Sequence, residues 1–205
     1  MTDAAGGTAE RPEGITPSQT AGPYFAYALT PAGRYAIADL ATNDLVTEDA
    51  AGERIAIEGR IRDGDGEFVT DAMLELWQAD GEGRYPGADP ALSNARFKGF
   101  GRCECDAEGR FSFRTVKPGP VPGPNGAVQA PHINVGVFAR GILRRLFTRI
   151  YFEDEAANAD DPILALVPAE RRSTLIAQRQ PGSGEPVYRL DIRLQGEDET
   201  VFFEA

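Results

Sequence analysis

The only histidine of the chain, His132, lies in the segment APHINV and is the first residue that could carry chemistry. An imidazole serves proteins as a metal ligand, as a general base or as a packed side chain, so its neighbours decide among these roles. Asn134 follows two residues later, which on a strand places both side chains on one face. A nucleophilic Ser–His or Cys–His pair would have to use this imidazole, but neither Pro131 nor Asn134 belongs to a hydrolase signature. The chain also lacks GxSxG, phosphate-loop and dinucleotide-binding motifs, so a metal site and a structural histidine are the open interpretations.

Two cysteines, Cys103 and Cys105, form the second group of reactive side chains. Because they are two residues apart in an expected strand, their side chains point the same way, which is a poor geometry for a disulfide bond. Two thiols could supply half of a soft-metal site, but the chain holds no second pair of cysteines. We therefore expect both thiols to be packing residues.

The charge balance restricts the partners of the chain. Its 32 acidic and 21 basic side chains give a net charge of -11. Nucleic acids and anionic membrane surfaces are bound chiefly through Lys and Arg, so we expect neither a nucleic acid nor a membrane surface as a partner. An anionic small substrate would need a local positive site. No apolar run approaches the roughly 20 residues of a membrane span, and residues 1–15 lack the features of a secretory signal. We therefore expect a cytoplasmic protein.

From residue 55 onward the apolar residues alternate with polar ones, as in IAIEGRI and YRLDIRL, which indicates half-buried strands. Turns rich in Asp and Gly separate the candidate strands at residues 62–67, 79–84 and 105–110. These features predict an all-β fold, an antiparallel β-sandwich. One short helix is expected in PAERRSTLIAQR, which begins at Pro168 and is followed by Pro181 and Gly182. Further strands are expected in AMLELWQA, GRCEC, RFSFRTV, HINVGVFA, RLFTRIYF and TVFFEA.

The length of 205 residues suits a single domain with a substantial core. We expect residues 1–15 to be a flexible N-terminal tail and residues 16–205 to form one domain. Within it, residues 16–54 are expected to be a long N-terminal arm, because TPSQTAGPYF favours an extended or turning path over a regular element. Such an arm could be a packing strap across the sandwich or part of a site.

Several long blocks resemble the intradiol ring-cleaving dioxygenases. They are LELWQADGEGRY, GFGRCECDAEGRFSFRTVKPGP and PHINVGVFARG, while TPSQTAGPYF, TRIYFEDE and RLDIRLQGEDETVFFE resemble one subunit type within that family. The resemblance runs from about Thr16 to Glu204, nearly the whole chain. It implies the family's β-sandwich, with the short helix and the long arm as the parts outside the sheets.

In iron-bearing chains of that family, two tyrosines and two histidines hold ferric iron, and these positions match Tyr85, Val121, His132 and Asn134 here. Hard Fe(III) suits phenolate oxygens, whereas valine has no lone pair to offer and the asparagine carbonyl is a weak, neutral ligand. The resemblance therefore implies that this chain binds no metal. His132 is then expected to be a buried structural imidazole and Tyr85 a packed tyrosine.

The resemblance implies that an iron-bearing beta subunit of the same fold is the partner and binds the Fe(III). It also implies insertion of O2 between the two hydroxylated carbons of protocatechuate, which yields 3-carboxy-cis,cis-muconate on the β-ketoadipate route of aromatic breakdown. This chain would lend residues to the partner's substrate pocket, with Arg140 neutralising the substrate carboxylate through a charge-assisted hydrogen bond. The residues implied in substrate binding are Thr20, Gly22, Pro23, Tyr24 and Arg140.

Three other interpretations have to be weighed. A dioxygenase that carries its own iron is opposed directly by Val121 and Asn134. A β-sandwich carrier or structural module with no part in catalysis would share the fold without the chemistry. For Arg140 alone, the simpler expectation is a surface arginine paired with a nearby acid.

Overall fold

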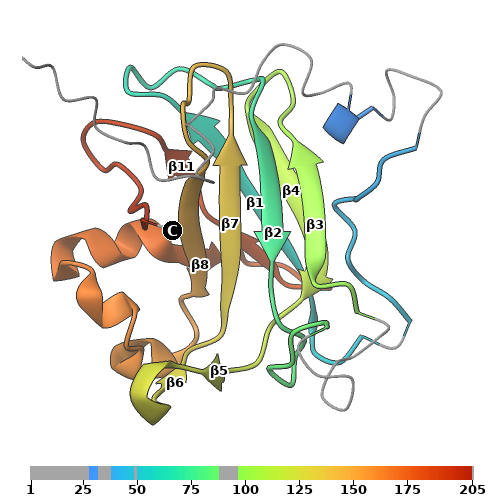
Figure 1. Cartoon of the computed structure of the whole chain (residues 1–205), viewed down its shortest axis with the longest axis vertical. Helices are drawn as coiled ribbons and strands as arrows, with labels where there is room; N and C mark the ends of the chain where they lie inside the picture. Colours follow the sequence, from blue (N-terminus) through green and yellow to red (C-terminus); the bar gives the residue numbers. More distant parts are fainter. Residues whose placement is uncertain (1–27, 32–37, 49, 88–96, 205) are drawn as a thin grey trace, which may run out of the picture.

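The alternating apolar residues form one face of a long strand, β1 (Arg54–Arg62), in the computed structural model (Figure 1). The structure describes residues 28–31, 38–48, 50–87 and 97–204. Ile55, Ile57 and Ile61 are fully buried, and the side chains between them are more exposed, apart from Gly59. This alternation follows because successive side chains of a strand point to opposite faces.

Nine of the eleven strands in the described part of the chain form two packed layers that are parts of one sheet, and β5 and β6 form a separate two-stranded ribbon. One layer contains β1, β4, β10 and β11, and the other contains β8, β7, β2 and β3, with β9 joining β10 to β8. In Figure 1 the β3–β2–β7–β8 layer lies in front of β1. The further strands are β2 (Met73–Trp77), β3 (Phe100–Glu104), β4 (Arg110–Val116), β5 (Val121–Pro122), β6 (Val128–Gln129), β7 (His132–Phe138), β8 (Leu146–Phe152), β9 (Ile176–Arg179), β10 (Val187–Arg189) and β11 (Ile192–Arg193).

The predicted all-β sandwich is confirmed, although its sheet is mixed. β1 pairs in parallel with β10 and β11, and β8 pairs in parallel with β9, while the remaining pairs are antiparallel. Parallel neighbours need a long crossover connection, and the segment between β8 and β9 provides one. That crossover carries three 3-10 helices, η2 (Ala156–Asp160), η3 (Leu164–Leu166) and η4 (Ala169–Leu175), and a fourth, η1 (Pro124–Gly126), precedes β6.

The predicted helix is present in its first half. The segment after Pro168 forms η4, but the following IAQR is strand β9. The helix ends there because Ala177 is fully buried and pairs with Phe152 of β8, so packing in the sheet overrides local helical preference. The expected C-terminal strand TVFFEA is reduced to an isolated bridge between Phe203 and Phe147.

The three predicted Asp-Gly turns have the same hydrogen-bond pattern. In each turn an aspartate Oδ1 accepts the backbone N–H groups two and four residues later, at 2.9 to 3.0 Å. The glycine three residues after each aspartate has a positive φ of 87°, 76° or 65°, which a side chain would strain. The aspartates are Asp63, Asp80 and Asp106, and the glycines are Gly66, Gly83 and Gly109.

The described part of the N-terminal arm packs along β3 and β4. Leu45 is 4% exposed and joins the core, and its backbone N–H donates to the carbonyl oxygen of Arg114. Gly101 of β3 permits this approach, since an added Cβ would lie 2.4 Å from Leu45 Cδ1. These residues act as a strap across the sheet, whereas residues 1–27, with Thr20, Gly22, Pro23 and Tyr24, lie outside the described residues.

The main core lies between the two layers and includes β1, β2, β4, β7 and β8 side chains. A second cluster, which contains Tyr151, Leu164 and Leu175, lies on the other face of β8 beneath the 3-10 helices. Cys105 is buried in the main core and Cys103 packs against it, and both thiols are free, as predicted. Within the described residues, no helix is long and apolar enough to cross a membrane.

Candidate functional site

The candidate site lies on the outward face of β7, at the beginning of the strand. Ile133, Val135 and Val137 are fully buried in the main core, so His132 and Asn134 point to the opposite face. β7 lies between β2 and β8, and its pairing register fixes the neighbours of these two side chains. His132 is opposite Tyr151 of β8, while Asn134 is flanked by Trp77 of β2 and Arg149 of β8.

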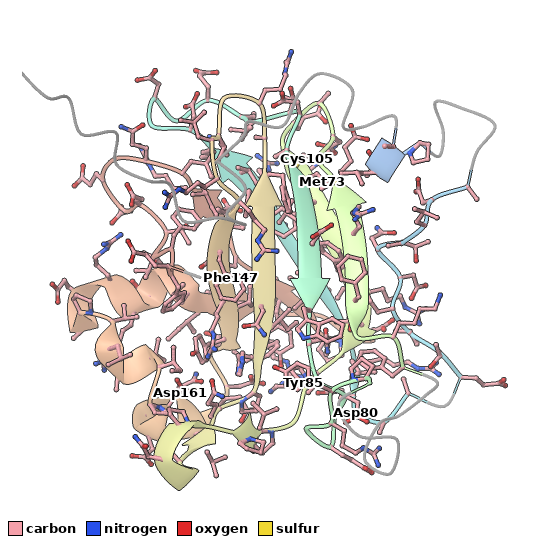
Figure 2. All side chains as sticks on the ribbon, viewed as in Figure 1. Met73, Asp80, Tyr85, Cys105, Phe147 and Asp161 are labelled. Carbon is pink, nitrogen blue, oxygen red and sulfur yellow. The ribbon has the colours of Figure 1, made fainter. Side chains whose placement is uncertain are left out.

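The structure brings Tyr85 to Asn134. The amide Nδ2 of Asn134 donates to the Tyr85 hydroxyl at 3.4 Å, and the Tyr85 ring stacks on Trp77 with 5.9 Å between ring centroids. Figure 2 shows Tyr85 and Asp161 near the β5–β6 end of the sheet and Met73 and Cys105 at the other end. Two of the four family ligand positions are therefore in direct contact.

The other two positions adjoin the same group of side chains. His132 is 3% exposed and donates from Nδ1 to the carbonyl oxygen of Ala130 at 2.8 Å. Val121 is also buried, and it pairs across the β5–β6 ribbon with Gln129. Gln129 Oε1 in turn accepts a hydrogen bond from Arg149 Nη1 at 2.8 Å, so the β5–β6 ribbon is joined through Gln129 to β8, the strand next to Asn134.

A hydrogen-bond network continues from Arg149 into the interior. Arg149 Nη1 donates to the Tyr151 hydroxyl at 3.3 Å, and that hydroxyl donates to Asp161 Oδ1 at 3.1 Å. Asp161 is 1% exposed, and its carboxylate also accepts the backbone N–H groups of Ile163, Leu164 and Ala130 at 2.7 to 3.0 Å. The carboxylate thus anchors the start of η3 and the backbone two residues before His132.

Burial keeps the imidazole and the two phenol groups of this site uncharged. It lowers the pKa of His132 to about 4, and the positive charge of Arg149 acts in the same direction. Burial raises the pKa of Tyr85, against the opposing effects of the Asn134 hydrogen bond and the Arg149 charge. Burial also raises the pKa of Tyr151 to about 12. At neutral pH the site therefore presents a neutral imidazole and two neutral phenols.

These residues do not fit a ferric ion. Val121 offers no donor atom, and the Asn134 amide turns its NH2 group toward the Tyr85 oxygen that a metal would need. Asn134 Oδ1 is buried without a hydrogen-bond partner among the described residues, and its cross-strand neighbour on β8 is the positively charged Arg149. A cation beside one imidazole and a hydrogen-bonded phenol is the opposite of the anionic ligand set that Fe(III) requires.

Arg140 lies beyond the far end of β7. The seven-residue strand separates its two ends by about 20 Å, so Arg140 is remote from Tyr85, His132 and Asn134. Its side chain is 67% exposed, and its Nε donates to the carboxylate of Asp71. The surface ion pair that was the simpler expectation is present, while a role in a substrate pocket stays a prediction.

The sequence-based reasoning missed Arg149, Trp77 and Asp161. Arg149 and Trp77 become site residues through the strand register, which depends on long-range pairing. Asp161 had a local signal, because an aspartate shortly before the apolar run ILAL is typical of a helix start.

Beside Asn134, the outward face also holds a pocket of about 320 Å³. Its lining includes the aromatic side chains of Trp77, Phe100 and Phe147.

A larger hollow of about 600 Å³ is lined by residues of β1 and β4 in one layer and of β3 in the other. Glu58, Arg60 and Arg110 are among the charged residues that line it. None of the residues implied by the resemblance contributes to its lining.

Comparison with known proteins agrees with the resemblance. A family model described as "Dioxygenase" matches residues 21–196. The chain is 52% identical over 195 residues to the protocatechuate 3,4-dioxygenase alpha chain of Burkholderia cepacia, covering 93% of this chain and 97% of the relative. It is 36% identical to the beta chain of the same enzyme from Burkholderia cepacia, over 79% of this chain and 73% of the relative.

A solved structure shares the fold as well. The dioxygenase domain of a carbohydrate-binding fusion protein from Streptomyces sp. SirexAA-E superposes with a TM-score of 0.61 at 26% identity, covering 88% of this chain and 98% of that domain. The family model and the relatives agree with the fold and with the resemblance found in the sequence. The chain belongs to the intradiol dioxygenase family.

Proposed function

We propose that this chain is the iron-free alpha subunit of a protocatechuate 3,4-dioxygenase and completes the substrate pocket of an iron-bearing beta subunit. The observation that carries the proposal is the 52% identity, over nearly the full length of both chains, to a relative named as such an alpha chain. The degenerate ligand set of Tyr85, Val121, His132 and Asn134 supports it, since these residues do not fit ferric iron.

The intradiol dioxygenases use ferric iron, and in this proposal the partner beta subunit holds it. The reaction is insertion of O2 between the two hydroxylated carbons of protocatechuate, with 3-carboxy-cis,cis-muconate as the product. The 36% identity to a beta chain supports pairing of two chains of one fold. The contribution of this chain is to bind and orient the substrate at the boundary between the two subunits.

Arg140 is the described residue best suited to that contribution. It is exposed and lies about 20 Å along β7 from the group of ligand positions Tyr85, Val121, His132 and Asn134, called the degenerate centre below. Its guanidinium is therefore available to a site in another chain. A guanidinium matches the two oxygens of a carboxylate, which is the anionic group of protocatechuate. We propose the arm residues Thr20, Gly22, Pro23 and Tyr24 as its companions in the pocket, from the resemblance alone.

Co-expression of the chain with an iron-bearing beta subunit tests the function. We expect the pair to contain iron and to consume O2 with protocatechuate, and the chain alone to be colourless and inactive. A visible phenolate-to-iron band in the chain alone would contradict the proposal. A beta subunit that is equally active by itself, with the same KM, would instead favour the purely structural alternative.

Arg140→Ala in the reconstituted pair tests the pocket role. Loss of a charge-assisted bond of roughly 1.5 to 3 kcal/mol should raise the KM for protocatechuate about ten- to hundredfold, with unchanged iron content. Arg189→Ala is the matched control, because Arg189 is also exposed and paired with an acid, Glu58, but lies in the other layer. An unchanged KM in Arg140→Ala would remove this role.

A further inference from the structure

The degenerate centre contains an internal cation. Arg149 is directly opposite Asn134 in the β7–β8 ladder, where facing side chains have Cβ atoms roughly 5 Å apart. Its Nη1 donates to Gln129, which pairs with Val121, and to Tyr151, which is opposite His132. Arg149 therefore lies on the strand next to β7, which carries two of the four family ligand positions, and bonds to the residue that pairs with a third, Val121.

The partners of this cation carry no charge. Arg149 Nη1 bonds to an amide oxygen and to a hydroxyl, and the Arg149 guanidinium carbon lies 6.0 Å from the centre of the Phe203 ring. Within the described part of the chain, no carboxylate forms an ion pair with Arg149. Asp161 is reached only through Tyr151. The positive charge is thus held in a partly buried place without a directly bound counter-ion, where screening by water is weak.

We propose that Arg149 takes the place of the metal ion as the cation of this centre, and that its charge keeps the centre metal-free even when the missing ligands are restored. A guanidinium keeps its charge throughout the physiological pH range, so this exclusion is permanent. It also donates hydrogen bonds to the Gln129 and Tyr151 oxygens. The proposal rests on the family's ligand positions and is independent of the partner subunit.

Restoring the ligands with and without Arg149 tests the proposal in the full-length chain. Val121→Tyr with Asn134→His rebuilds the family set, and the same pair is prepared with Arg149→Gln or with Arg149→Lys. We expect the visible phenolate-to-iron band and bound iron, after exposure to ferric nitrilotriacetate, only with Arg149→Gln. If the Arg149→Gln protein binds no more iron than the protein that keeps Arg149, the proposal is overturned. Lysine keeps the positive charge, so the proposal would also be overturned if the Arg149→Lys protein bound as much iron as the Arg149→Gln protein.

A second pair of variants covers the possibility that Tyr does not fit in the buried space of Val121. Asn134→His alone gives a set of Tyr85, His132 and the new imidazole, which we probe with Zn²⁺ by calorimetry. Adding Arg149→Gln should tighten Zn²⁺ binding at least about tenfold by removing a nearby like charge. Adding Arg189→Gln instead removes a charge from the other layer and should leave the affinity unchanged. Equal affinities with and without Arg149 would refute the exclusion.

Discussion

Protonation of His132 should destabilise the folded chain as the pH falls. His132 is 3% exposed, its Nδ1 is bound to the Ala130 carbonyl, and the positively charged Arg149 lowers its pKa further. The folded-state pKa is about 4, against an ordinary value of 6.5. Because the unfolded chain binds the proton more readily, the free energy of unfolding decreases as pH falls from about 6.5 toward 4.

The size of this effect follows from the difference between the two pKa values. About 2.5 pH units correspond to about 3 kcal/mol once the pH is below 4. At pH 5 the unfolded imidazole is almost fully protonated and the folded one is largely neutral, so about 2 kcal/mol should already be lost. Above pH 7 the imidazole is neutral in both states and contributes no pH dependence.

His132→Asn is the matched variant, because the asparagine amide can keep the hydrogen bond to Ala130 without a titrating group. Urea unfolding of both proteins at a series of pH values between 8 and 5 measures the difference. The natural protein should lose about 2 kcal/mol more than the variant over this range, whatever the constant cost of the substitution. Parallel pH profiles would show that the imidazole is not held neutral, and would refute the reasoning about this buried site.

Three further experiments test the packing of the site and of the rest of the chain. Asp161→Asn should lower the free energy of unfolding by about 2 to 4 kcal/mol in urea, because one amide cannot accept every bond that the buried carboxylate accepts. Gly101→Ala should cost about 1 to 3 kcal/mol in the same assay, and Leu45→Ala should recover part of it, since the new Cβ would lie 2.4 Å from Leu45 Cδ1. Burial raises the pKa of Cys105 to about 12, so at pH 8 its thiolate fraction should be about a thousandfold below that of an ordinary thiol. Iodoacetamide followed by mass spectrometry should therefore leave Cys105 unmodified until the chain unfolds.

The period-two pattern was sufficient to predict the strands that are buried on one face. β1 and β7 are examples, because each alternates apolar and polar residues over most of its length. The Asp-Gly turns were equally predictable, since the aspartate and the positive-φ glycine act within five residues of each other. By contrast, IAQR is a strand because β8 and β10 flank it, and no local feature of the segment encodes that pairing.

The residues of the candidate site also fall into those that the sequence predicted and those that depend on long-range pairing. The resemblance identified Tyr85 and Asn134, and the structure places them in contact. Arg149 could not be found from spacing, because it lies fifteen residues from Asn134 and faces it only through the β7–β8 register. The sequence also does not show that the hydrogen-bond partners of Arg149, Gln129 and Tyr151, carry no charge.

The two ends of β7 differ in burial: one end is a buried centre and the other carries an exposed arginine. This difference determines where a substrate could react. At the first end, His132 is buried and neutral, and the positively charged Arg149 lies beside a site that lacks two of the four iron ligands. At the other end, Arg140 is exposed on the surface beside Asp71. A regular strand with fully buried alternate residues cannot shorten the distance of about 20 Å between them. Any anionic substrate that contacts Arg140 must therefore react at a centre outside this one, which agrees with the proposed pairing of this chain with a second chain that holds the metal.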